Sequence, residues 1–92
     1  MTKEQYYDAA ADCASMLTTL NECRDAANPT SDGHLAFMCG EIVRLAYQNR
    51  FEKASRWLGF VQGVLVAQGR LSLEQAKRAN MPAGAEFDGE RI

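Results

Sequence analysis

The stretch from about Phe51 to Gln68 constrains the fold more than any other part of this chain. Ten of its 18 residues are apolar, and they spread well beyond a single helical stripe. At 100° per residue, the largest apolar group still gathers on one side of a helix. That group is Ala54, Trp57, Leu58, Val61, Val64 and Leu65. We therefore predict a helix over residues 51–68 that lies at the centre of a bundle or in a subunit interface.

Capping signals and apolar periodicity predict a long first helix. The Thr2–Gln5 segment has the form of a capping box, which begins a helix. We expect Asn28-Pro29 to end this helix, because proline disfavours helical geometry in the residue before it. Its apolar face consists of Tyr6, Ala10, Cys13, Leu17 and Leu20.

Two more helices flank the apolar stretch. Ser31 or Asp32 should cap the second helix. A second capping box at Ser72–Gln75 begins a short fourth helix, which Met81-Pro82 should end. Gly69 suits the left-handed position that follows a helix. The apolar stripe of the second helix is Leu35, Met38, Cys39, Ile42, Leu45 and Ala46.

The predicted fold is all-α: a small bundle of three main helices with a short C-terminal helix. A chain of 92 residues with 47% hydrophobic residues forms one domain, which we place at residues 1–82. Residues 83–92 are small, glycine-containing and acidic, so we expect them to form a flexible acidic tail.

The net charge of −2 is the sum of three unlike segments. Residues 1–32 carry a net −4, residues 33–81 a net +4 and residues 82–92 a net −2. The low total argues against binding to duplex nucleic acid or to a membrane surface, since both select strongly basic surfaces. The basic middle segment either packs beside the acidic first helix or meets a small anionic ligand.

The chain contains nothing that looks like a targeting or membrane-spanning segment. The N-terminus is too polar for a signal peptide, and no apolar run approaches the roughly 18 residues of a transmembrane helix. Cys13, Cys23 and Cys39 form no CxxC pair and are predicted to be reduced core thiols. We therefore expect a protein of the cytoplasm.

A strip of small residues runs along the predicted third helix, roughly opposite its main apolar side. Two glycines inside a helix destabilise it by about 1 kcal/mol each relative to alanine, so we expect a compensating contact. The strip either packs tightly against another helix, within the chain or across a dimer, or lines a ligand groove beside Arg56 and Gln62. Its members, spaced four residues apart, are Ser55, Gly59, Gly63 and Ala67.

Basic and aromatic residues alternate around the junction of the second and third helices. Arginine forks match phosphate geometry, and aromatic faces stack on nucleobases. The alternative is a solvated basic face whose aromatic residues belong to the core. The candidate ligand-binding residues are Arg44, Tyr47, Arg50, Lys53, Arg56, Trp57, Phe60 and Gln62.

No pattern typical of catalysis or metal binding stands out. His34 is the only histidine, and a spacing of five residues points it away from Cys39 on a helix. An all-α magnesium hydrolase would need carboxylate pairs on separate helices. We interpret the two pairs present, Asp8/Asp12 and Glu22/Asp25, as the solvated face of the first helix. We predict no catalytic residue, no metal and no cofactor.

The segment Glu52–Leu65 reads EKASRWLGFVQGVL and is similar to EKAxRWLGFxQGxL, a motif of small phage and prophage proteins. In that family an upstream His-Leu with a Met shortly after precedes the motif, and a capped helix ending in Asn-Met-Pro follows it. These features match His34, Leu35 and Met38, and Asn80, Met81 and Pro82. The resemblance covers roughly residues 34–82. It implies a phage-encoded accessory protein in bacterial cytoplasm and carries over no functional residue.

Small helical phage proteins commonly act by binding, so we expect a non-enzymatic binding protein that forms a homo-oligomer. The favoured hypothesis is a counter-defence protein that sequesters a nucleotide-derived immune signal, of the cyclic-nucleotide or ADP-ribose type. The basic middle segment and the glycine strip motivate it. The alternative is a protein–protein inhibitor or adaptor, which uses the apolar third helix or the acidic first helix on a host protein.

Overall fold

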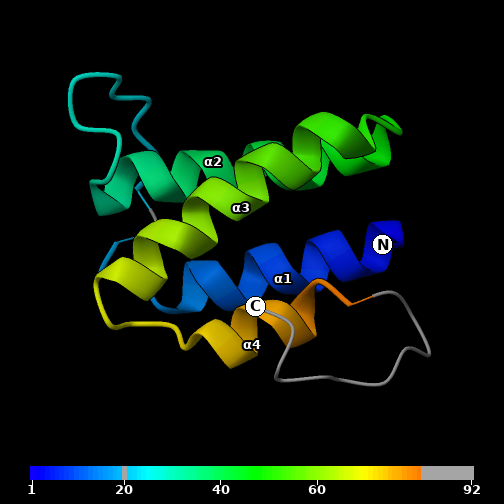
Figure 1. Cartoon of the computed structure of the whole chain (residues 1–92). Coiled ribbons are helices and arrows are strands. Elements are labelled where there is room, and N and C mark those ends of the chain that lie inside the picture. Colours follow the sequence, from blue (N-terminus) through cyan, green and yellow to red (C-terminus); the bar gives the residue numbers. More distant parts are fainter. Residues whose placement is uncertain (20, 82–92) are drawn as a thin grey trace.

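The computed structural model describes residues 1–19 and 21–81, and these form four helices and no strand (Figure 1). The helices are α1 (Lys3–Ser15), α2 (Asp32–Tyr47), α3 (Phe51–Ala67) and α4 (Leu73–Ala79). In the view of Figure 1, α1 lies between α3 above and α4 below. The predicted all-α bundle of three main helices and a short fourth is confirmed. Leu20, Pro82 and the expected tail over 83–92 lie outside the described residues.

Hydroxyl side chains begin three of the helices, as predicted. The Thr2 and Ser72 hydroxyls accept hydrogen bonds from the backbone N–H groups of Gln5 and Gln75, at 3.1 and 3.0 Å. The two glutamine side chains accept in return from the cap backbones, which completes both capping boxes. Ser31 caps α2 through the backbone N–H three residues further on.

Left-handed residues follow α2 and α3. Gly69 has a φ of 72°, which confirms its predicted position after α3. Asn49 has a φ of 62° in the tight turn from α2 to α3. Asparagine is one of the few residues that tolerate this conformation. The short turn keeps α2 and α3 side by side.

α1 ends at Ser15 rather than at Asn28-Pro29, so it is much shorter than predicted. Distant side chains bind the backbone groups that a longer helix would use. Arg70 Nη1 donates to the carbonyl oxygen of Met16 at 3.0 Å, and the Thr18 N–H donates to the Asp32 carboxylate at 2.7 Å. These contacts turn the chain out of the helix.

Residues 21–31, which precede α2, therefore form a loop. Glu22, Cys23 and Asp25 lie in it, so the predicted helical face carrying Glu22 and Asp25 does not exist. The prediction of Cys23 as a core thiol is also wrong, because this residue is exposed. Cys13 and Cys39 are buried, as expected.

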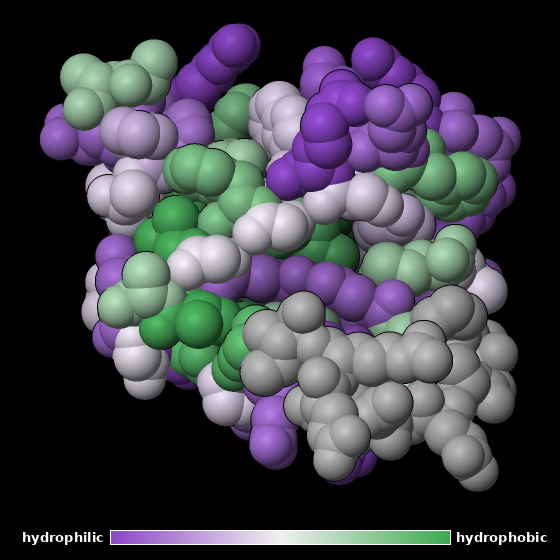
Figure 2. Space-filling model, in the orientation of Figure 1, coloured by the Kyte–Doolittle hydropathy of each residue, from purple (hydrophilic) through white to green (hydrophobic). Residues whose placement is uncertain are grey.

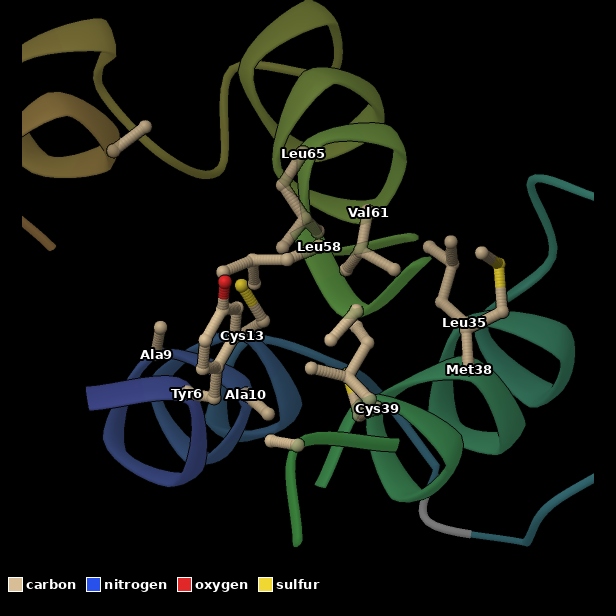
Figure 3. Packing of buried hydrophobic residues seen from close by; sticks show 14 of the residues in the cluster. Tyr6, Ala9, Ala10, Cys13, Leu35, Met38, Cys39, Leu58, Val61 and Leu65 are labelled. Atoms are coloured by element: carbon tan, nitrogen blue, oxygen red, sulfur yellow. The ribbon is translucent and has the colours of Figure 1, made fainter. Parts of the chain in front are cut away.

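The hydrophobic core lies where α1, α2 and α3 meet. Figure 3 shows Leu58 and Leu65 of α3 pointing toward Tyr6 and Cys13 of α1, whereas Val61 points toward α2. Burial of such side chains is the main favourable contribution to folding. The largest fully buried side chains are Leu35, Ile42, Leu45, Leu58, Leu65, Val61 and Cys13.

α3 is packed on one side only within the described chain. Its predicted apolar side is confirmed, since Leu58, Val61 and Leu65 are buried and Trp57 is half-buried. The opposite side faces solvent, and Phe60 on it is 41% exposed. α3 is thus not enclosed by the other helices.

A charged cluster, the Asp32 clamp, joins three parts of the chain. Asp32 Oδ1 accepts from Arg70 Nη2 at 2.7 Å, and Oδ2 accepts from Arg70 Nη1 at 3.0 Å. Oδ2 also accepts from the Thr18 N–H and hydroxyl, at 2.7 and 2.8 Å. The Arg70 hydrogen bonds, followed by those of Thr18, hold the pKa of Asp32 well below its ordinary value. The clamp fixes the end of α1, the start of α2 and the α3–α4 connection.

Candidate functional site

Two of the four predicted phosphate-binding cations are paired with carboxylates of their own helices. Arg44 Nε donates to Glu41 at 3.0 Å, and Arg56 Nη1 donates to Glu52 at 3.0 Å. A phosphate would have to compete with these carboxylates. Arg50, at the turn before α3, is exposed.

The predicted aromatic residues are divided between the surface and the edge of the core. Lys53 Nζ lies 5.5 Å above the centre of the Trp57 ring, and the half-buried Trp57 lies 6.4 Å from the Phe37 ring. Tyr47 is 54% exposed, with Lys3 Nζ 5.9 Å from its ring centre. Trp57 and Tyr47 line neither of the two hollows described below.

Gln62 is not grouped with the other predicted ligand-binding residues. It is only 4% exposed, and its Nε2 donates to Asn80 Oδ1 at 3.0 Å. Asn80 Nδ2 donates back to Gln62 Oε1 at 2.7 Å. This reciprocal amide pair ties α3 to the end of α4, a contact that the sequence did not reveal.

The small-residue strip on α3 is exposed along its whole length. No atom of the described chain lies within 4 Å of a Cβ built on Gly59 or Gly63. Packing of the strip against another helix within the described chain is therefore wrong. Ser55, at one end, is hydrogen-bonded to the Tyr6 hydroxyl, which also donates to the Phe51 carbonyl oxygen at 3.3 Å.

An apolar hollow, the alanine groove, runs between α1 and α2. It has a volume of about 280 Å³. Small side chains form both walls, so a bound segment could approach the two helix backbones closely. The groove was not predicted from the sequence. The alanines of α1 are the sequence feature that corresponds to it. Its lining residues are Tyr7, Ala10, Ala11, Ala14, Glu22, Ala36, Cys39, Gly40 and Val43.

Glu22 extends from the loop onto the alanine groove. Its Oε1 lies 2.8 Å from the position that a Cβ on Gly40 would occupy, so the carboxylate rests directly against the backbone of α2. Within the described part of the chain, the Glu22 carboxylate has no ion pair or hydrogen bond. A carboxylate with no cation thus lies on an apolar surface.

A second hollow, the α4 cleft, lies between α1, α3 and α4 and has a volume of about 540 Å³. α4 is held at its C-terminal end, where Gln5 Nε2 donates to the Met81 carbonyl oxygen at 2.6 Å. Along its length α4 touches α1 only lightly. The cleft is lined by Ala9, Asp12, Cys13, Ser15, Met16, Gln62, Leu71, Gln75, Ala76, Arg78 and Ala79.

The surface beside these hollows is mixed in character. On the face shown in Figure 2, apolar residues gather over the end of α3 and the start of α4, and hydrophilic residues run across the middle. Leu73 at the start of α4 is 44% exposed. Exposed apolar residues are normal in folded proteins, because apolar atoms contribute about half of the accessible surface.

His34 and the buried thiols have structural surroundings. His34 Nδ1 accepts from the Asp25 N–H at 3.0 Å, which anchors the loop to α2. Burial raises the pKa of Cys13 to about 11 and that of Cys39 to about 12. Both thiols are therefore protonated at neutral pH. Residues 1–19 and 21–81 contain no group of three His, Cys, Asp or Glu side chains that could hold a metal ion.

Comparison of the chain with protein-family models, with curated proteins and with solved structures gives no match. In the part of the chain that the structure describes, no helix has the length and apolar character needed to cross a bilayer. The function is therefore inferred from the two hollows and the exposed faces.

Proposed function

We propose that the protein is a non-enzymatic binding protein that holds a basic helical segment of a partner protein in the alanine groove. The observation that carries this proposal is the apolar hollow with a carboxylate on it that has no cation partner among residues 1–19 and 21–81. Small residues on both walls allow a third helix to pack closely against α1 and α2. Amphipathic helices bind in this way to apolar grooves of their partners.

The negative charge around the alanine groove favours a partner segment with basic residues. The Glu22 carboxylate lies on the groove, and residues 1–32 carry a net −4. Glu4 and Asp8 on the exposed side of α1 add to the negative field beside it. A helix with an apolar stripe flanked by lysine or arginine complements this surface, and charge complementarity of this kind favours fast and selective association.

The geometry gives less support to a nucleotide-derived ligand on the predicted basic and aromatic residues. Arg44 and Arg56 are paired with carboxylates, Gln62 is turned into the interior, and small-molecule sites are usually concave. Binding to a protein through acidic α1 therefore ranks first. In line with the phage resemblance, we propose that the partner is a bacterial protein of the host cytoplasm.

The variant Glu22→Lys should weaken partner binding about tenfold, because the cationic residue of the partner would then face a lysine. The measurement is co-purification of the tagged full chain from bacterial lysate, followed by titration of the identified partner. Glu74→Lys on exposed α4 makes the same charge change away from the groove and should leave binding unchanged. Ala14→Phe places a large side chain in the groove and should also weaken partner binding.

A peptide of the partner's basic helix should compete for the groove. The proposal fails if the captured protein has no such helix, or if it binds Glu22→Lys and Ala14→Phe as strongly as the natural chain. Circular dichroism of each variant establishes that the fold is retained.

We also propose that the chain self-associates through the exposed strip of α3. No described residue covers Gly59 and Gly63, which leaves room for a second helix to approach the α3 backbone, and Phe60 beside them is large and 41% exposed. Contact with a second copy would compensate for the helix-destabilising effect of Gly59 and Gly63.

Gly59→Ala and Gly63→Ala should each raise the free energy of unfolding of the single chain by roughly 0.5–1 kcal/mol, because no described atom opposes the new methyl group. They should at the same time weaken self-association. Urea denaturation and sedimentation equilibrium measure the two effects. Gly40→Ala on α2 is the matched control and should leave association unchanged. Undiminished association of both α3 variants, or a monomeric natural chain at high concentration, would contradict this proposal.

A further inference from the structure

We propose that protonation of His34 releases the loop that holds Glu22 on the alanine groove, so that binding of the basic partner segment weakens in mildly acidic solution. This inference rests on the proposed function, because it concerns the regulation of the same groove. His34 is the only histidine of the chain. Histidine is the only side chain whose ordinary charge change falls between about pH 5 and pH 8.

Two hydrogen bonds fix the loop over residues 21–31 to the start of α2. The Cys23 N–H donates to the Gly33 carbonyl oxygen, and the Asp25 N–H donates to His34 Nδ1, both at 3.0 Å. The loop lies directly on the helix here, since a Cβ on Gly33 would be only 3.3 Å from the Cβ of Cys23. Because Glu22 is next to Cys23, these contacts determine where its carboxylate lies.

The second of these hydrogen bonds depends on the charge of His34. The Nδ1 atom accepts a hydrogen bond only while it carries no proton, and in the imidazolium both ring nitrogens are donors. Protonation therefore replaces the bond from the Asp25 N–H with a repulsion between two N–H groups. The Cys23 bond joins two backbone groups and does not titrate.

The Asp25 carboxylate gives the protonated ring another partner. It accepts from the Asn28 side chain at 3.2 Å, and this bond is the main cause that lowers the pKa of Asp25. The charge of His34 contributes to the same lowering, so the two side chains lie near each other. An imidazolium is thus attracted by the Asp25 carboxylate and repelled by the Asp25 N–H, and the loop has to rearrange around it.

The other charges around His34 belong to the loop, α2 and α3. The Arg24 guanidinium lies 5.8 Å from the centre of the Phe37 ring, which is 6.0 Å from the His34 ring. His34 lies in the first turn of α2, where the helix dipole opposes a positive charge and the Asp25 carboxylate favours it. The remaining charged groups are Asp32, bound by Arg70; Glu41, bound by Arg44; and Lys53, above the Trp57 ring.

Amide hydrogen exchange of the full chain, measured by NMR without any partner, tests the release of the loop. Between pH 7.5 and pH 5.5 the protection factor of the Asp25 N–H should fall roughly three- to tenfold, the effect of losing one hydrogen bond. The protection factor of the Leu58 N–H in α3 is the internal reference and should not change.

Two variants of His34 separate protonation from other effects of pH. His34→Gln has a carboxamide oxygen that can accept from the Asp25 N–H and does not titrate, so its protection factor should be the same at both pH values. His34→Lys has a positive charge and no acceptor, so Asp25 should be poorly protected at both. Circular dichroism of each variant establishes that the fold is retained.

Titration of the partner at the two pH values tests the regulation of the groove. The natural chain should bind roughly three- to tenfold more weakly at pH 5.5, and His34→Gln should bind equally well at both. The inference is overturned if the protection of Asp25 does not depend on pH, or if His34→Gln loses protection or affinity as the natural chain does. Absence of any basic partner at pH 7.5 contradicts the proposed function instead, because the exchange measurement needs no partner.

Discussion

Leu58→Ala should lower the free energy of unfolding by about 2–5 kcal/mol, the usual range for removing a buried leucine side chain. Leu58 is 1% exposed and lies on the side of α3 that faces α1 (Figure 3). The total stability of a chain of this length is roughly 5–14 kcal/mol, so the variant should lose a large share of it. Urea denaturation followed by circular dichroism measures the change.

Leu73→Ala is the control for this prediction. Leu73 is 44% exposed on α4, so the same truncation should change stability by less than about 1 kcal/mol. Equal effects at the two positions would mean that α3 does not pack against α1 and α2 as described.

Asp32→Ala should destabilise the fold by about 2–3 kcal/mol, because it removes charged hydrogen bonds and leaves Arg70 without its carboxylate. The side chains of Asp32 and Arg70 are only 17% and 26% exposed, so water replaces these bonds incompletely. Glu52→Ala breaks the well-exposed pair with Arg56 and should change stability by less than about 1 kcal/mol. A similar loss in both variants would contradict the special role of the clamp.

The Asp32 clamp also predicts a pH dependence. Because the pKa of Asp32 is lowered on folding, the clamp stabilises the folded chain fully above the unfolded-state pKa of about 3.9. That contribution is lost as the pH falls through the lower, folded-state pKa. The natural chain should therefore lose stability below about pH 4 more steeply than Asp32→Ala. Parallel denaturation midpoints of the two between pH 6 and pH 2 would disprove this.

Local signals predicted the parts of the fold that depend on neighbouring residues. The capping boxes at Thr2 and Ser72 and the left-handed Gly69 need only a few adjacent residues, and each is confirmed. The apolar side of α3 followed from periodicity, because a helix that must bury a face repeats apolar residues every three or four positions.

The end of α1 could not be predicted, because its cause lies far along the chain. Leu17 continues the apolar spacing of α1, so periodicity favours a longer helix. Arg70 and Asp32 instead bind Met16 and Thr18, across sequence separations of 54 and 14 residues. A pattern read along one helix contains no information on such partners.

The candidate sites were predicted only in part, for related reasons. The acidic N-terminal segment is visible in the sequence, but the sequence predicts Gln62 as a ligand contact and does not reveal its partner, Asn80. Alanines such as Ala10 and Ala14 are read as good helix formers, which conceals that they form the wall of a groove. Residues that shape a hollow by being small give weak sequence signals.

The three thiols differ in exposure, so their labelling rates can report how often the helical bundle opens. Cys23 is exposed, so we expect a thiol reagent to label it first, whereas Cys13 and Cys39 are buried and protonated. Cys13 and Cys39 line the two hollows but are only 2% and 5% exposed, so labelling of either thiol needs the helices around it to move apart. Their labelling rate, referred to that of Cys23 in the same tube, therefore reports how often the bundle opens under native conditions, without any denaturant.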